Sequence, residues 1–141
     1  MAKHQFEKLF TPQEANALIP QLEASIRGLQ VEVEALRAQV RDLACEDSDV
    51  EGLPLLQLVE RYPKLKANAS RMAELASQIE SLGCILKDIE LGLVDFPCEV
   101  EDDVVFLCWQ FGEREIVAWH SIDSGFADRR PLPGASKPYL N

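Results

Sequence analysis

The chain has 141 residues, of which 24 are Asp or Glu and 14 are Lys or Arg, so its formal net charge is −10. A chain of this length can bury the core of one domain. The strongly acidic charge argues against binding to the phosphate backbone of nucleic acids or to an anionic membrane surface.

Hydropathy and cysteine usage indicate the compartment. No stretch of about 18 apolar residues predicts a transmembrane helix. The first ten residues lack the apolar segment of a secretory signal peptide. We therefore expect a cytoplasmic protein, with a single domain over residues 1–132 and a flexible tail over residues 133–141. No C-x-x-C pair occurs, which favours reduced, buried thiols, at Cys45, Cys84, Cys98 and Cys108.

A long helix is predicted in the first third of the chain. Thr11, Pro12 and Glu14 form the pattern of a capping box with proline at the first helical position. Apolar residues then recur at spacings of three and four up to Leu43, which is a heptad pattern. We expect a helix from residue 12 to about residue 44, kinked at Pro20 because proline lacks a backbone donor.

A second long helix is predicted after a short helix at residues 54–60. It should begin at Asn68 as N-cap and end near Gly92, and its apolar residues also recur at spacings of three and four. Two long helices joined by a compact link predict an antiparallel helical hairpin. The apolar stripes are wider than a two-helix seam needs, so we expect a homodimer with a four-helix arrangement.

A β-hairpin is predicted from residues 104–111 and 116–120. An odd number of loop residues puts Cys108 and His120 on one face of the hairpin, and an even number puts them on opposite faces. Gly112 comes first in the loop, which favours the even case and argues against a direct Cys108–His120 metal pair. Both faces are apolar, so the N-terminal segment, the C-terminal tail or a second subunit must cover one of them.

The predicted fold is therefore mainly α, of the α+β kind, with a long antiparallel helical hairpin and a C-terminal β-hairpin packed at one end. This packing would gather polar residues where the β-hairpin folds back onto the helix end. Such a group could hold a divalent metal ion or an anionic ligand. The spacing of these residues does not match a known metal-binding motif. The alternative is that they form salt bridges and caps that hold the β-hairpin to the helical stem. These residues are Asp88, Asp95, Glu113, His120 and Arg129.

Four segments carry a family resemblance: LFTPQEANALIP (residues 9–20), LGCILKDIELGLVDFP (82–97), LCWQFGEREIVAWH (107–120) and GFADRRPL (125–132). Together they resemble the uncharacterised bacterial domain-of-unknown-function family 2203. Some members carry a loose cell-division label, which implies only coiled-coil character. The chain departs from the family's usual glycine and glutamine at Asp128 and Arg130. The resemblance implies a candidate ligand site at the matching polar positions, Lys87, Asp88, Asp95, Glu113, His120 and Arg129.

Two functions follow as expectations. The first is a non-enzymatic, homodimeric interaction or scaffold protein of the coiled-coil type, with a protein as its partner. It is favoured by the heptad helices and by the absence of a phosphate-binding glycine loop or a G-x-S-x-G motif. The alternative is a metal- or small-ligand-binding protein, an enzyme included, with a polar site around His120. No motif identifies a cofactor.

Overall fold

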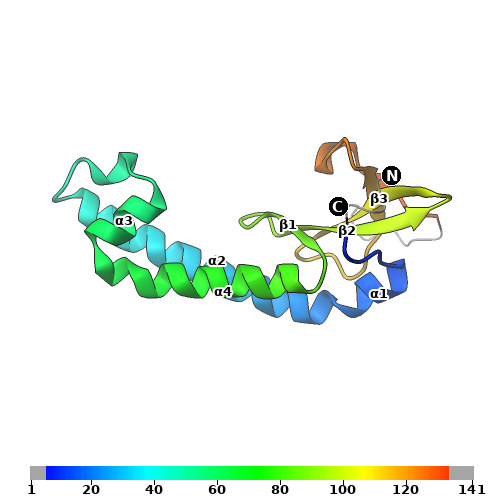
Figure 1. The fold of residues 1–141 in the computed structure, drawn as a ribbon, viewed down its shortest axis with the longest axis horizontal. Helices are drawn as coiled ribbons and strands as arrows, with labels where there is room; N and C mark the ends of the chain where they lie inside the picture. The colour runs from blue at the N-terminus through cyan, green and yellow to red at the C-terminus, as the bar shows by residue number, and fades with distance from the viewer. Residues whose placement is uncertain (1–5, 134–141) are drawn as a thin grey trace.

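The structure is a computed structural model, and it describes residues 6–133. Figure 1 shows an elongated molecule, with a two-helix stem that carries a short helix at one end and a β-sheet at the other. The helices are α1 (Pro12–Ala17), α2 (Ile19–Ala44), α3 (Leu55–Arg61) and α4 (Lys66–Ser81). The strands are β1 (Ile85–Asp88), β2 (Leu93–Val100), β3 (Asp103–Gln110), β4 (Ala118–Ser121) and β5 (Arg130–Pro131).

The predicted capping box opens α1. The backbone N–H of Glu14 donates to Thr11 Oγ1 at 3.1 Å, and the Thr11 N–H donates to Glu14 Oε1 at 3.0 Å. The long predicted helix is divided at Leu18, which separates α1 from α2. Pro20 thereby falls in the first turn of α2, where its missing N–H leaves no hydrogen bond unmade.

The stem consists of α2 and α4, which run antiparallel and side by side (Figure 1). Asn68 was expected to cap the second helix, but α4 begins at Lys66. The Asn68 side chain is buried instead. It donates to Glu32 Oε1 at 2.7 Å and accepts a hydrogen bond from the Gln39 amide, so it links the two helices. None of the helices within residues 6–133 combines the length and apolar character that crossing a bilayer requires.

The predicted fold class, a long helical hairpin with a C-terminal β-hairpin, is wrong, because residues 6–133 form four α-helices and a five-stranded sheet. The second helix does not reach Gly92, because it ends at Ser81 and is followed by Gly83 in a left-handed conformation, with φ of 100°. The next residues form β1 and β2, and the sheet has five antiparallel strands in the order β1-β2-β3-β4-β5. Six consecutive residues of β2 are buried, so this strand lacks the alternation by which a half-exposed strand is recognised.

The even-loop prediction is also wrong. In the ladder between β3 and β4, Phe106 lies opposite His120 and Cys108 lies opposite Ala118, so residues 109–117 form the connection and their number is odd. A contact from another part of the chain lengthens this connection without changing whether its number of residues is odd or even. The Ile116 N–H donates to Asn16 Oδ1 of α1 at 2.6 Å and therefore does not join the strand ladder.

The sheet has two distinct faces. One face packs on α1 and α2, where Phe96, Leu107 and Trp109 join Leu22 and Ile26 in the main core. The other face carries Asp95, Phe106, Cys108 and His120.

The second face is covered by the chain's own segments. The Phe6 ring meets the Phe106 ring edge to face at 5.6 Å, and Phe126 lies in the segment that follows β4. The argument for a dimer from an uncovered sheet face therefore does not hold. Of the predicted tail, residues 134–141 lie outside the described residues.

Candidate metal centre

Three side chains with metal-binding atoms converge on the face of the sheet away from the helices. Asp95 of β2 lies opposite Cys108 of β3, and His120 of β4 lies opposite Phe106, two residues from Cys108. Side chains two residues apart on a strand share a face. One ligand atom from each of Asp95, Cys108 and His120 lies within 4.8 Å of the other two, and all three residues are buried.

The hydrogen bonds of His120 define its tautomer. Its Nδ1 lies 2.8 Å from the backbone oxygen of Ser121, which can only accept, so Nδ1 carries a proton. Its Nε2 lies 3.2 Å from Asp95 Oδ1. If the imidazole is neutral, Nε2 has no proton, and its lone pair faces a carboxylate oxygen. Two such acceptors approach this closely only when a cation, a proton or a metal ion, lies between them.

Burial controls the ionisation of the other two groups. Removal from water raises the pKa of the Asp95 carboxyl, although the neighbouring His120 opposes this shift. Removal from water, together with the negative charge of Asp95, raises the pKa of the Cys108 thiol to about 12. Cys108 is therefore not a thiolate nucleophile at neutral pH by itself, and an added positive charge is needed to ionise it.

The three side chains open onto a cavity of about 180 Å³. Lys87 lies on its wall, and the Lys87 ammonium is 5.4 Å from the centre of the Phe106 ring. The positive charge of Lys87 also acts on Asp95. The rest of the lining comes from β2 and from the segment after β4, namely Leu93, Ser124, Gly125 and Phe126.

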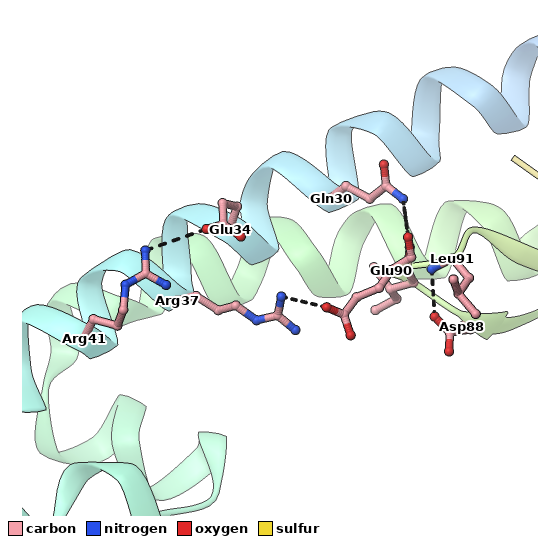
Figure 2. A network of polar contacts seen from close by, with 8 residues as sticks. Gln30, Glu34, Arg37, Arg41, Asp88, Glu90 and Leu91 are labelled. Atoms are coloured by element: carbon pink, nitrogen blue, oxygen red, sulfur yellow. Dashed lines mark hydrogen bonds and ion pairs between the residues drawn. The ribbon is translucent and has the colours of Figure 1, made fainter. Parts of the chain in front are cut away.

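The structure divides the six residues predicted as a site. Asp95 and His120 belong to the cluster, and Lys87 lines its cavity. Asp88 lies elsewhere: its carboxylate accepts from the Leu91 N–H at 2.9 Å and holds the turn between β1 and β2. Figure 2 shows Asp88 beside Leu91 in that turn, which also contacts the stem.

That turn is fastened to α2 by a separate polar network (Figure 2). Arg37 forms an ion pair with Glu90 at 2.8 Å, and the Gln30 amide donates to the backbone oxygens of Ile89 and Glu90 at 3.0 and 3.1 Å. These contacts position β1, and with it Lys87, against the stem.

Glu113 and Arg129 form a nearly buried ion pair at 2.7 Å, with side-chain exposures of 9% and 14%. Glu113 also accepts from the Gln110 N–H at 2.8 Å, and the Arg129 guanidinium lies 4.7 Å from the centre of the Phe126 ring. Neither residue lines the cavity. Their contacts brace the segment after β4 over the sheet, which is the structural role considered for them.

Cys108 was not among the predicted site residues. The glycine at the start of the loop favoured an even hairpin, which turns Cys108 away from His120. The signal that identifies Cys108 was the odd-loop alternative, which the observed register of β3 against β4 fulfils.

Fold and site together define an α+β protein with a five-stranded antiparallel sheet on a helical stem and a buried Asp–Cys–His cluster. The chain belongs to the family described as "Uncharacterized conserved protein (DUF2203)", which matches residues 8–132. This confirms the family assignment made from the sequence motifs. No curated protein and no solved structure matches the chain.

Proposed function

We propose that this protein binds a transition-metal ion, with Zn²⁺ the best fit, through Asp95, Cys108 and His120. The proposal is supported above all by the two nitrogens of His120. A metal-ligating histidine characteristically donates its second N–H to a carbonyl or carboxylate. Nδ1 of His120 has such a partner in the Ser121 oxygen, while Nε2 is directed at the cluster.

The donor set and spacing fit zinc. One thiolate, one imidazole and one carboxylate suit this borderline-soft ion, which prefers tetrahedral coordination. Two ligands bonded at about 2.0 Å to a tetrahedral ion are about 3.3 Å apart. The distance of 3.2 Å between His120 Nε2 and Asp95 Oδ1 agrees with this geometry. Binding would displace the thiol proton of Cys108, which couples metal affinity to pH.

The number of ligands also matters. Within residues 6–133 no fourth His, Cys, Asp or Glu joins the cluster. Structural zinc sites are closed by four protein ligands, whereas three protein ligands leave a position for water or an exchangeable ligand. A metal held here would therefore keep an open position toward the cavity.

The test is a zinc titration of the metal-free protein in competition with a chromophoric chelator. We expect one Zn²⁺ per chain. The near-isosteric variants Cys108→Ser, His120→Gln and Asp95→Asn should each weaken affinity by more than about 100-fold, beyond the range seen for second-shell partners. Cys98→Ser is the matched control, because Cys98 is a buried thiol in the core between sheet and helices.

The results discriminate as follows. Unchanged far-ultraviolet circular dichroism establishes that the variants remain folded. A wild-type protein that fails to compete with the chelator would contradict the proposal. An equal loss of affinity in Cys98→Ser would show that the thiols act through stability rather than as ligands.

The homodimeric interaction protein stays a second proposal. Val31 is 61% exposed and Leu91 is 53% exposed. Native mass spectrometry at micromolar concentration tests it, and a monomer would contradict it. We also propose a cytoplasmic location, supported by the four free cysteines.

A further inference from the structure

We infer that the open position of the proposed metal centre takes the carboxylate group of a small organic monoanion, and that Lys87 supplies the cation that pairs with it. This inference rests on the proposed metal site and names the class of ligand that the site would bind. Three observations carry it: the charge balance of the cluster, the position of Lys87, and the size and lining of the cavity.

The charge balance favours a single negative charge. Carboxylate from Asp95 and thiolate from Cys108 together neutralise a divalent ion, and His120 as a ligand is neutral. The remaining charge on the cavity wall is the ammonium of Lys87. Glu113 and Arg129 neutralise each other in their ion pair. A monoanion would therefore leave the site neutral, whereas a dianion such as phosphate would leave an excess negative charge in a partly dehydrated cavity.

The position of Lys87 follows from an irregularity in the strand. The pairing of β1 with β2 shifts register between Leu86 and Asp88, so Lys87 occupies a bulge. Bulges redirect side chains and are frequent beside functional sites. The bulged side chain reaches the cavity and places its ammonium against the face of the Phe106 ring. Lys87 and the candidate metal ligands thus line the same cavity.

The cavity sets the size and character of the ligand. Its volume of about 180 Å³ is small beside the range of about 300–1,000 Å³ that is usual for ligand pockets. This suits a molecule of a few heavy atoms. Beyond the charged groups, Leu93 and Phe126 present apolar surface, and Gly125 adds no side chain. A short alkyl chain attached to a carboxylate matches this combination.

The test uses cobalt as a spectroscopic substitute for zinc. Protein loaded with Co²⁺ should show a thiolate-to-cobalt charge-transfer band from Cys108 and visible bands that report the coordination number. Butyrate should change the visible bands in a saturable way, while n-butanol, which lacks the charge, should not. Inorganic phosphate should bind more weakly than butyrate.

Charge variants test the role of Lys87. Lys87→Met should keep cobalt binding and weaken butyrate binding by about tenfold, the expected loss for one charge-assisted contact. Lys87→Arg should restore most of that affinity. Lys64→Met is the matched control, because Lys64 is an exposed lysine at the far end of the stem, and it should behave as wild type.

The failures are distinguishable. A thiolate-to-cobalt band without any response to butyrate would overturn this inference and leave the metal site standing. Absence of the band would overturn both proposals. Equal butyrate affinity in Lys87→Met and Lys64→Met, or tighter binding of phosphate than of butyrate, would overturn the charge-matching argument.

Discussion

The two ends of the molecule are built differently. The far end of the stem has a small aliphatic cluster whose members all come from one continuous stretch of sequence, Leu36, Leu43, Val50, Leu58 and Leu65. The sheet end has a core that joins Phe10, Leu22 and Phe96 to Trp109 and Ile116, which are far apart in the sequence. The far end therefore depends on local contacts, and the sheet end on long-range ones.

The ends also differ in the charges they bury. Within residues 6–133, the buried carboxylate and the buried imidazole, Asp95 and His120, both belong to the sheet end. The ionised groups at the far end, Asp47 and Arg61, stay in contact with water. Burying a titratable group is costly unless a partner compensates it. The sheet end bears this cost, which supports the proposal of a metal site there rather than in the stem.

The largest expected difference between the ends is in how much stability is lost when a buried leucine is replaced by alanine. Leu22→Ala should lower the free energy of unfolding by about 4 kcal/mol, because Leu22 is fully buried in the interlocked main core. Leu58→Ala should lower it by only about 2 kcal/mol, because its small cluster can collapse around the gap. Urea denaturation measures both values. Equal losses would mean that the far end is as tightly packed as the sheet end.

A pair of glycines gives effects of opposite sign, one beside the sheet and one inside the stem. Gly92 has φ of 69°, and a Cβ there would lie 2.5 Å from the Cβ of Phe111, so Gly92→Ala should destabilise by about 3 kcal/mol. In the stem, a Cβ at Gly28 would lie 3.4 Å from Leu75 Cδ1, an ordinary contact. Gly28→Ala should stabilise by up to about 1 kcal/mol through helix propensity. Thermal unfolding tests both signs, and destabilisation by Gly28→Ala would contradict the packing described for the stem.

The smallest effect is a pH dependence at the far end. The Tyr62 hydroxyl donates to Asp47 Oδ2 at 2.6 Å, which lowers the pKa of Asp47 and raises the pKa of Tyr62. Because the pKa of Asp47 is lower in the folded state than its unfolded value of about 3.9, the Asp47 carboxylate stabilises the fold at pH values above about 3.9. This stabilisation is lost as the pH falls through the folded-state pKa. The Tyr62 hydroxyl, whose pKa is raised, stabilises the fold at pH values below its unfolded pKa of about 10. This stabilisation is lost as the pH rises through the folded-state pKa.

The Tyr62→Phe variant tests that dependence and keeps the ring in place. It should be less stable than wild type at neutral pH, and the difference should shrink in acid below about pH 4 and in strong alkali. Denaturation midpoints across the pH range provide the measurement. A constant difference at every pH would show that the hydroxyl contributes through packing rather than through the charge of Asp47.

Features with local causes could be predicted from the sequence. The capping box at Thr11 and Glu14, the end of α2 at Ala44 and the short helix α3 each depend on residues within a few positions of one another. The β1 and β2 strands could not be recognised in the same way. Their apolar residues continue the three-and-four spacing of the preceding helix, and β2 is buried on both faces.

The candidate site was predicted in part for the same reason. Asp95 and His120 were expected near one another because the hairpin must fold back on the helices, and Lys87 was expected there from the family resemblance. Asp88 was placed with them, although its carboxylate instead holds a local turn. Cys108 was excluded because hairpin register depends on the exact length of the loop.

By itself, the sequence determined the capping box at Thr11 and Glu14, the end of α2 and the family, since these depend on side-chain types at short spacing. The tertiary structure alone decided which side chains share a face of the sheet. The register that pairs Phe106 with His120 makes the number of residues in the connection odd, so Cys108 shares a face with His120 and Asp95. Asp95 and His120 are 25 residues apart in the sequence, a separation at which no local propensity or periodicity acts.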